Sequence, residues 1–153
     1  MRVRRGDIFY AQLNPVVGDI EGNLARLRQV LEETRSARPD LVVFPELFLT
    51  GYPPRDLLER ADFRARVEAA VHAVVALSKD FPETGILFGA PVKGEGSRRL
   101  YNAALLAAEG RLLFSQAKSL LPTYDVFDEA RYFDPAPSVR AVPFRGEILG
   151  ISI

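Results

Sequence analysis

The apolar positions of the chain repeat at helical spacing in two stretches, 20–37 and 62–80. Recurrence every three or four residues, with charged residues between, predicts an amphipathic helix that buries one stripe. Asp19 stands directly before the first stretch and is expected to cap that helix. The apolar stripes consist of Leu24, Leu27, Val30 and Leu31 in the first stretch and of Phe63, Val67, Ala70, Val71 and Val74 in the second.

Short runs of branched and aromatic residues between turn signals predict strands. The run 41–44 is wholly apolar, which indicates a strand covered on both faces. Glu109-Gly110 separates the two arms of a predicted hairpin, and Arg145-Gly146 separates two further strands. Strands are expected at 8–13, 41–44, 85–92, 100–107, 111–117, 139–144 and 148–153. The order strand, helix, strand, helix and then several strands predicts a mixed α/β layered domain.

Two segments break this periodicity and are predicted to be loops. Residues 45–56 contain three prolines and a glycine, and they follow directly after the apolar run 41–44. This loop is therefore expected at the carboxyl end of a buried strand, where ligands gather in open α/β sheets. Residues 118–137 form a long irregular segment with aromatic and acidic residues. Gly94-Glu95-Gly96 is interpreted as a hairpin turn.

The charge balance and the lack of cysteine exclude several functions. The 153 residues include 20 basic and 20 acidic side chains, and a net charge of zero argues against a protein that tracks nucleic-acid phosphates. No cysteine is present, which excludes disulfides, thiolate zinc sites and a thiol nucleophile within these residues. The single histidine, His72, falls off the apolar stripe of its helix. It is expected at the surface, and no metal site is predicted.

No membrane or cofactor signal is visible in the sequence. No run of 18 apolar residues occurs, and Asp7 interrupts any apolar leader. No membrane partner is therefore expected, and a cytoplasmic location is the default. Neither common glycine-rich phosphate cradle is present, so no nucleotide cofactor is expected in this domain. The serines lack a histidine partner in a strand–turn–helix setting, which argues against a serine hydrolase.

Glu46 and Lys118 are the leading candidates for catalysis. Glu46 follows the buried run 41–44, where a carboxylate can be partly desolvated and can act as a general base. The alternative is that Glu46 caps the next turn or faces solvent. Lys118 follows the predicted strand 111–117 and could present a fixed ammonium to a developing oxyanion. The alternative is an ordinary surface lysine at a strand end.

A third candidate is a cluster of alternating aromatic and acidic residues within the irregular segment. Such a cluster could form a polar pocket or an ordered surface loop, and the sequence leaves both open. Its members are Tyr124, Asp125, Phe127, Asp128, Glu129 and Tyr132.

Four motifs in a fixed order extend over nearly the whole chain. They are 11–23 (AQLNPVVGDIEGN), Phe44-Pro45-Glu46-Leu47 with Gly51-Tyr52-Pro53, Tyr101-Asn102-Ala103-Ala104, and 118–124 (KSLLPTY) with Val126-Phe127-Asp128-Glu129. Together they resemble the nitrilase (carbon–nitrogen hydrolase) superfamily. Within it they look most like the glutaminase domains of glutamine-dependent NAD⁺ synthetases.

This resemblance implies an α/β fold, the four-layer αββα sandwich, of which the chain would cover roughly the first half to two-thirds. It implies that residues 1–153 are a single, incomplete N-terminal glutamine amidotransferase domain. The family reaction uses Glu, Lys and Cys, and by position Glu46 matches the base and Lys118 the stabiliser of the tetrahedral intermediate. The family cysteine follows an apolar strand that 148–153 resembles. The chain is therefore expected to stop at or before the nucleophile and to be inactive alone.

The resemblance also implies a binding site and partners. Tyr124 is the best match for a glutamine contact, Phe127 and Tyr52 are weaker matches, and Glu129 matches a second carboxylate that orients Lys118. Glutamine is the implied substrate, and a C-terminal synthetase domain would use ATP and Mg²⁺ to amidate deamido-NAD to NAD. The superfamily implies a homo-oligomer. Two other hypotheses stay open: a free-standing amidase for another small amide, and a non-catalytic binding or assembly module.

Overall fold

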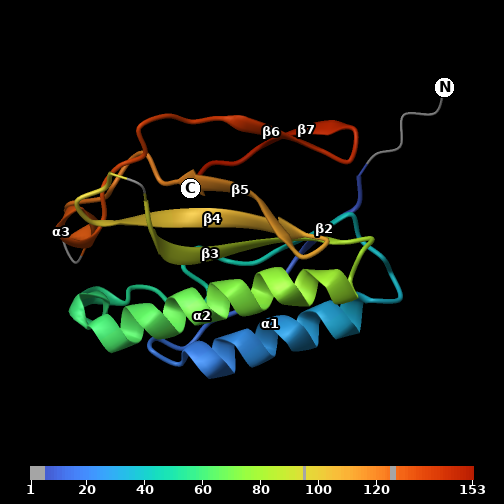
Figure 1. Ribbon diagram of the computed structural model, residues 1–153, viewed down its shortest axis with the longest axis horizontal. Coiled ribbons are helices and arrows are strands. Elements are labelled where there is room, and N and C mark those ends of the chain that lie inside the picture. The colour runs from blue at the N-terminus through green and yellow to red at the C-terminus, as the bar shows by residue number, and fades with distance from the viewer. Residues whose placement is uncertain (1–5, 95, 125–126) are drawn as a thin grey trace.

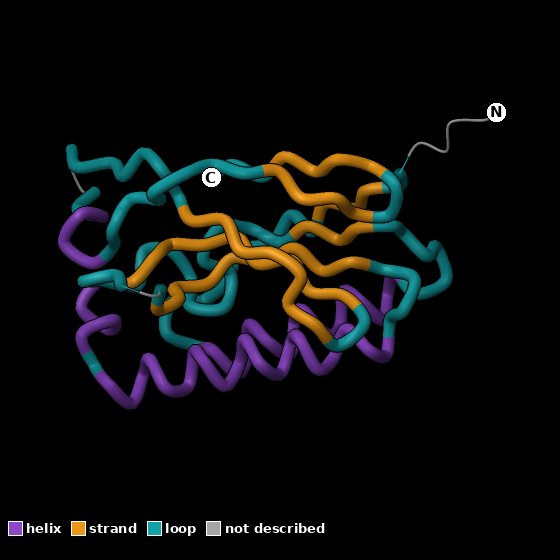
Figure 2. Tube along the Cα trace, turned by 45° about the horizontal axis from the view of Figure 1, so that its top comes forward, coloured by secondary structure: helices purple, strands orange, loops and turns teal. Residues whose placement is uncertain are grey.

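A five-stranded sheet lies between two long helices on one face and a two-stranded hairpin on the other (Figure 1). The computed structural model describes residues 6–94, 96–124 and 127–153. Figure 2 shows the two helices together on one side of the strands. In chain order the elements are β1 (Ile8–Tyr10), α1 (Ile20–Thr34), β2 (Leu41–Val43), the 3₁₀ helix η1 (Arg55–Glu59), α2 (Ala61–Leu77), the 3₁₀ helix η2 (Ser78–Asp80), β3 (Gly85–Lys93), β4 (Leu100–Ala108), β5 (Arg111–Ala117), α3 (Glu129–Tyr132), β6 (Ala141–Phe144) and β7 (Glu147–Gly150).

The sheet topology brings several strand ends to one edge. The strands lie in the order β1-β2-β3-β4-β5. β1, β2 and β3 are parallel to one another, and β4 is antiparallel to both β3 and β5. β5 therefore runs in the same direction as β2 and β3. The carboxyl ends of these three strands and the start of β4 all reach the same edge of the sheet.

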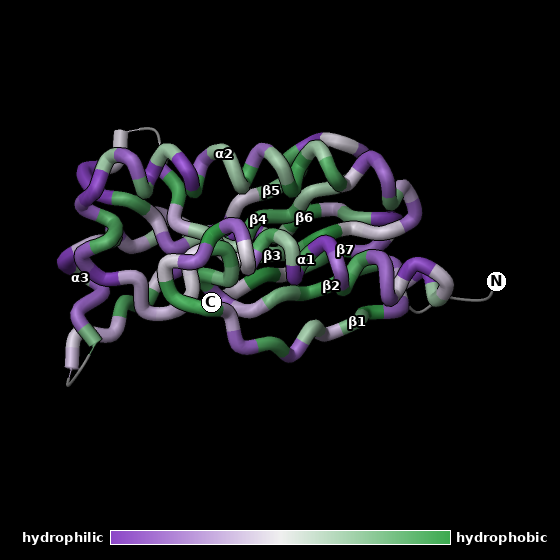
Figure 3. The backbone as a smooth tube through the Cα atoms, turned by 90° about the horizontal axis from the view of Figure 1, so that it is seen from below, coloured by the Kyte–Doolittle hydropathy of each residue, from purple (hydrophilic) through white to green (hydrophobic). Residues whose placement is uncertain are grey.

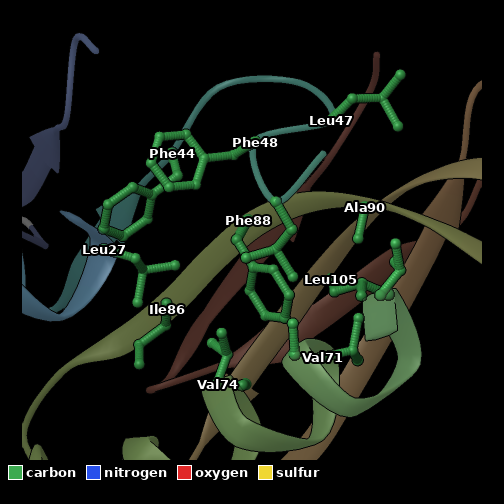
Figure 4. Close-up of a cluster of buried hydrophobic side chains, with 14 of the residues drawn as sticks. Leu27, Phe44, Leu47, Phe48, Val71, Val74, Ile86, Phe88, Ala90 and Leu105 are labelled. Carbon is green, nitrogen blue, oxygen red and sulfur yellow. The ribbon is translucent and has the colours of Figure 1, made fainter. Parts of the chain in front are cut away.

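The main hydrophobic core fills the layer between the sheet and the helices (Figure 4). Ile86, Phe88 and Ala90 alternate along β3, so their side chains point to the same face, and all three are fully buried. Leu105 of β4 pairs with Phe88 across the ladder, and Val74 of α2 lies in the same cluster. Figure 3 shows the central strands as largely hydrophobic, whereas α2 alternates between hydrophobic and hydrophilic residues. This alternation is the amphipathic pattern expected from the sequence.

The β6–β7 hairpin is fixed to the opposite face of the sheet. Phe144 of β6 lies so close to Gly85 of β3 that a β-carbon at Gly85 would come within 2.5 Å of its ring. In the hairpin turn, Arg145 donates to the carbonyl of Pro82 at 2.9 Å and pairs with Asp40 at 3.5 Å. Phe144 and Arg145 thus help to hold the hairpin against the sheet.

Both predicted helices are confirmed, although α1 is shorter than its predicted span. Asp19 caps α1 as expected, because its carboxylate accepts a 3.0 Å hydrogen bond from the backbone N–H of Gly22. α1 ends at Thr34 and not at residue 37. Beyond Thr34 the N–H groups of Arg35 and Ala37 bond to carbonyls three residues back and not four, and Arg38 then enters the left-handed region with a φ of 48°. α2 gives way to the 3₁₀ helix η2 over the last residues of its predicted span.

Every predicted strand is present, with differences at the ends. β1 ends at Tyr10 and not at residue 13, because the N–H of Gln12 turns back to the carbonyl of Tyr10 at 3.1 Å. β7 ends at Gly150 and not at residue 153. The segment 118–137 was expected to be irregular throughout, but it contains the one-turn helix α3.

Three residues named in the sequence analysis lie outside the residues that the structure describes. These are Glu95 of the predicted turn, Asp125 of the aromatic and acidic cluster, and Val126 of the fourth motif. Over the described ranges, no helix combines the length and hydropathy needed to cross a membrane. Over the same ranges, no three histidine or acidic side chains gather closely enough to hold a metal ion.

Candidate active site

Glu46, Asn102 and Lys118 meet at the edge of the sheet where β2 and β5 end and β4 begins. Glu46 lies in the turn that follows β2, Asn102 lies near the start of β4, and Lys118 directly follows β5. The N–H of Lys118 donates to the carbonyl of Asn102 at 2.8 Å, which extends the β4–β5 ladder by one bond. The common edge of the sheet therefore explains why residues more than 50 positions apart become neighbours.

A close approach between backbone segments fixes the turn that carries Glu46. The N–H of Leu49 donates to the carbonyl of Gly89 in β3 at 3.2 Å. A β-carbon at Gly89 would lie 2.2 Å from the backbone nitrogen of Leu47, far inside van der Waals contact. Only glycine at this position of β3 lets the turn pack so tightly against the sheet.

Lys118 forms ion pairs with two carboxylates. Its Nζ lies 2.8 Å from Oε1 of Glu46 and 3.2 Å from Oε1 of Glu129. The Lys118 side chain is 11% exposed and that of Glu129 6%, whereas that of Glu46 is 34% exposed. Burial disfavours the charged ammonium, but the hydrogen bonds and charges of Glu46 and Glu129 outweigh it and raise the pKa of Lys118 above its ordinary value. The lysine is therefore held as a cation.

Tyr52 supports the ion pair between Lys118 and Glu129. Its hydroxyl donates to Oε1 of Glu129 at 2.8 Å, so the same oxygen accepts from Tyr52 and from Lys118. Burial and the hydrogen bond to the Glu129 carboxylate raise the pKa of Tyr52, which keeps the hydroxyl protonated as a donor. Glu129 itself starts α3, and its N–H donates to the carbonyl of Pro122 at 3.2 Å.

Asn102 completes the network and is the residue that the sequence did not single out as a candidate. Its Nδ2 donates to Oε1 of Glu46 at 2.6 Å, and the residue is 1% exposed. An asparagine in the apolar run of β4 is the signal that could have found it, because a buried amide needs a hydrogen-bond partner. In the sequence, Tyr101-Asn102 belongs only to the motifs that carry the family resemblance.

The predicted binding residues lie beside this network. The ring of Phe127 packs 6.4 Å from that of Tyr52 and 5.6 Å, edge-on, from that of Tyr124. Tyr124 is 65% exposed. A cavity of about 350 Å³ adjoins Tyr52, Phe127 and Glu129. The structure thus joins Glu46, Lys118, Glu129 and Tyr52 by hydrogen bonds and places Phe127 and Tyr124 next to them. The remaining lining residues of the cavity are Leu47, Pro53, Pro54, Arg55, Asp56, Asp128, Arg131, Tyr132 and Phe133.

The arrangement has the parts needed for acid–base and oxyanion chemistry. A partly exposed carboxylate, Glu46, lies next to a fixed cation, Lys118, at the rim of a sheet. Such a pair can accept a proton at one group and stabilise negative charge at the other. His72 is exposed on α2, as expected, and lines a separate cavity formed mainly with β3.

Comparison with known proteins identifies a family and relatives that match nearly the whole chain. The family model described as carbon-nitrogen hydrolase matches residues 10–153. A relative named glutamine-dependent NAD(+) synthetase, from Thermotoga maritima, is 36% identical over 151 residues, which cover 99% of this chain and 26% of the relative. This chain thus spans about a quarter of the length of the curated relatives that it matches.

Solved structures share the same fold. The glutamine-dependent NAD⁺ synthetase from Acinetobacter baumannii, in complex with ADP, aligns with a TM-score of 0.85 at 29% identity, over 96% of this chain and 27% of that one. An amidase from Nesterenkonia sp. aligns with a TM-score of 0.83 at 23% identity, over 98% of this chain and 57% of that one. This second similarity concerns the fold alone. Because the family model matches residues 10–153 of the 153-residue chain, the chain belongs to the carbon–nitrogen hydrolase family.

Proposed function

We propose that this sequence is the N-terminal glutaminase domain of a longer glutamine-dependent NAD⁺ synthetase. In this role it hydrolyses the side-chain amide of glutamine and supplies ammonia for the ATP-dependent amidation of deamido-NAD to NAD. The observation that carries the proposal is the ion-pair network in which Lys118 joins Glu46 and Glu129. The names of the relatives, and the quarter of their length that this chain spans, support it.

The chemistry of amide hydrolysis assigns a role to each member of the network. An amide is a poor electrophile, so a thiolate must attack its carbonyl, and a base must take the thiol proton. Glu46 is the proposed base, and Lys118 is the proposed donor to the oxyanion, an effect worth about 3–4 kcal/mol for one such donor. Glu129 and Tyr52 hold Lys118 in place. Since residues 1–153 include no cysteine, the thiol belongs to another part of the longer protein.

A small cavity adjoins the network at Tyr52 and Glu129, and neither Glu46 nor Lys118 is among its lining residues. Its volume of about 350 Å³ is at the small end of the range for small-molecule sites. Phe127 and Tyr52 provide apolar surface next to Glu129, and Tyr124 extends that aromatic row toward solvent. Charged side chains of both signs also line the cavity, and two of them, Arg131 and Asp56, pair with each other at 3.4 Å.

The proposal includes expectations about the rest of the longer protein. ATP and Mg²⁺ bind in its synthetase portion, and the glutaminase portion needs neither. The protein acts in the cytoplasm and assembles as a homo-oligomer. The proposed substrate is a small-molecule amide, and the net charge of zero of the 153 residues agrees with such a substrate.

The test compares two nitrogen sources in the longest native polypeptide that contains this sequence, called here the longer protein. Lys118→Ala should abolish NAD formation from deamido-NAD and ATP when glutamine is the donor. NAD formation with free ammonia should persist, because that step does not use Lys118. The 153-residue polypeptide alone should release no ammonia from glutamine.

Other outcomes point elsewhere. If the longer protein releases ammonia from a different amide and forms no NAD, it is an amidase of the same family. If it hydrolyses no amide, the network serves binding or assembly. An equal loss of glutamine-driven and ammonia-driven turnover in Lys118→Ala, with a native circular dichroism spectrum, would contradict the assigned role of Lys118.

A further inference from the structure

The two carboxylate oxygens of Glu46 have different surroundings. Oε1 accepts hydrogen bonds from Nδ2 of Asn102 at 2.6 Å and from Nζ of Lys118 at 2.8 Å. Among the residues that the structure describes, none donates a hydrogen bond to Oε2 of Glu46. Because the side chain is 34% exposed, a group outside the described network can approach it. The carboxylate is thus held on one side and open on the other.

We propose that Asn102 is a positioning residue that reserves Oε1 of Glu46 for the network and leaves Oε2 as the atom that takes the proton. This inference rests on the proposed function and adds the identity of the reacting oxygen. A carboxylate oxygen has about two lone-pair sites in the plane of the group. Both sites of Oε1 are occupied by N–H donors. A proton could reach Oε1 only if Asn102 or Lys118 moved away.

The proton transfer balances without a further reactant. The S–H bond of a thiol in the longer protein breaks, and an O–H bond forms on Oε2 of Glu46, which becomes a neutral carboxyl group. The thiolate then attacks the amide carbonyl. As the C–N bond breaks, the same proton passes from Oε2 to the departing nitrogen, which leaves as ammonia. Glu46 ends this half of the reaction as the carboxylate that it was at the start.

The backbone around Asn102 prevents its amide from moving away. Asn102 pairs with Pro91 of β3 on one side, and on the other its carbonyl accepts from the N–H of Lys118 at 2.8 Å. The residue is 1% exposed, so its side chain is packed on nearly all sides. The segment that delivers Lys118 to Glu46 is therefore anchored by the same residue that donates to Glu46.

The side-chain oxygen of Asn102 indicates that the residue acts as a hydrogen-bond donor to Glu46 and not as an acceptor. Its Oδ1 is buried, and no described residue donates to it. A buried acceptor without a donor costs free energy, so an asparagine here is unfavourable for stability on that side. The N–H donor to Glu46 is the part of the amide with a partner. We infer that this contact outweighs the unpaired acceptor.

The experiment uses two variants of similar size in the longer protein. Asn102→Asp replaces the donor with an acceptor, and Asn102→Leu removes both the donor and the unpaired acceptor. Both should lower kcat for glutamine hydrolysis at least about 100-fold, the lower end of what a positioned base contributes. The KM for glutamine should stay within about twofold, and ammonia-driven NAD formation should be unchanged. A merely structural role predicts instead that activity follows stability, so that a well-folded Asn102→Leu would remain active.

A matched control lies on the neighbouring strand. Gln116 of β5 is also a buried amide, 3% exposed, but its hydrogen bonds go to Ala117, Ser138 and Arg140 and not to the network. Gln116→Leu should lower the midpoint of thermal unfolding and leave kcat per folded molecule unchanged.

The parent protein and Glu46→Gln together separate failure of the inference from failure of the proposed function. If the parent protein hydrolyses no glutamine, the proposed function itself is wrong. If the parent and Glu46→Gln hydrolyse glutamine equally well, the function stands but Glu46 is not the base, and the inference about its Oε2 is overturned. If Glu46→Gln abolishes turnover while both Asn102 variants keep kcat within about twofold, Glu46 is the base and the inference about Asn102 is overturned. A fall in kcat for Gln116→Leu equal to that of the Asn102 variants would also overturn it.

Discussion

Tyr52 and Glu129 are 77 residues apart in the sequence and are joined by a hydrogen bond of 2.8 Å between the tyrosine hydroxyl and a carboxylate oxygen. Tyr52 comes from the proline-rich loop after β2, and Glu129 starts the one-turn helix α3. This hydrogen bond joins the loop after β2 to the start of α3, next to Lys118. Glu129 can hold the ammonium of Lys118 only while its own orientation is fixed, and Tyr52 provides that fixation.

Tyr52→Phe should therefore weaken the network without breaking it. The variant removes one donor from Glu129 Oε1, which keeps its contact with Lys118. A hydrogen bond to a charged group contributes about 1.5–3 kcal/mol, so the free energy of unfolding should fall by roughly that amount. Urea unfolding at pH 7 measures the change. Tyr10→Phe is the matched control, because Tyr10 is 70% exposed on β1 and should change stability by less than about 0.5 kcal/mol.

Gly89→Ala should displace the turn that carries Glu46. A β-carbon at Gly89 would lie 2.2 Å from the backbone nitrogen of Leu47, so the turn or β3 must shift. Overpacking of this kind costs about 1–3 kcal/mol of folding free energy. Glutamine hydrolysis by the longer protein should fall with it, because Glu46 moves relative to Lys118.

Gly6→Ala is the control for this substitution. The nearest heavy atom to a β-carbon built at Gly6 is 3.8 Å away, an ordinary van der Waals contact far from the network, so stability and activity should stay close to those of the parent chain. Equal effects of the two substitutions would show that the close approach at Gly89 is not what constrains the turn. Unfolding free energy and kcat measured on the same samples give the comparison.

The elements of the fold were predictable because their signals are local and repeated. Periodic apolar residues located α1 and α2, and the hairpin between β4 and β5 followed from Glu109-Gly110, which adopts positive φ at both positions. The helix end at Thr34 was less predictable. It depends on a change at Arg35 and Ala37 from four-residue to three-residue hydrogen bonds, for which the sequence carries no signal.

The site was only partly predictable, because it depends on contacts between distant segments. The strand-end positions of Glu46 and Lys118 and the acidic cluster that contains Glu129 made these residues candidates, but surface alternatives stayed open until the family resemblance was added. The contact between Asn102 and Glu46 was not predicted, since the two residues are 56 positions apart and no local pattern joins them. The helix α3 was missed because one turn is too short for a periodic signal, and tertiary contacts of Glu129 stabilise it.

Asp19→Ala should destabilise the start of α1. The carboxylate of Asp19 accepts from the N–H of Gly22, one of the four N–H groups that a helix leaves unpaired at its start. Loss of such a cap costs about 1 kcal/mol, whereas Asp19→Asn keeps a side-chain acceptor and should cost less. Thermal unfolding of the three chains measures the order. Equal stability of Asp19→Ala and the parent would show that the cap contributes nothing.

The raised pKa of Lys118 should make stability depend on pH in alkaline solution. The folded protein holds the Lys118 proton more tightly than the unfolded chain, whose lysine has the ordinary pKa of 10.5. Below that pH both states are protonated, and the ion pairs contribute fully. Above it the unfolded chain loses the proton first, so the free energy of unfolding should fall by up to about 1.4 kcal/mol per pH unit until the folded pKa is passed.

The measurement is urea unfolding between pH 9 and pH 12 in the Tyr52→Phe background. That background is needed because the raised pKa of Tyr52 lowers stability in the same direction above its ordinary value of 10.0. Lys118→Met in this background should show a shallower fall with pH. Lys79→Met should keep the full slope, because Lys79 pairs with no carboxylate among the residues that the structure describes. Identical slopes for Lys118→Met and its parent would mean that Glu46 and Glu129 do not hold the ammonium in solution.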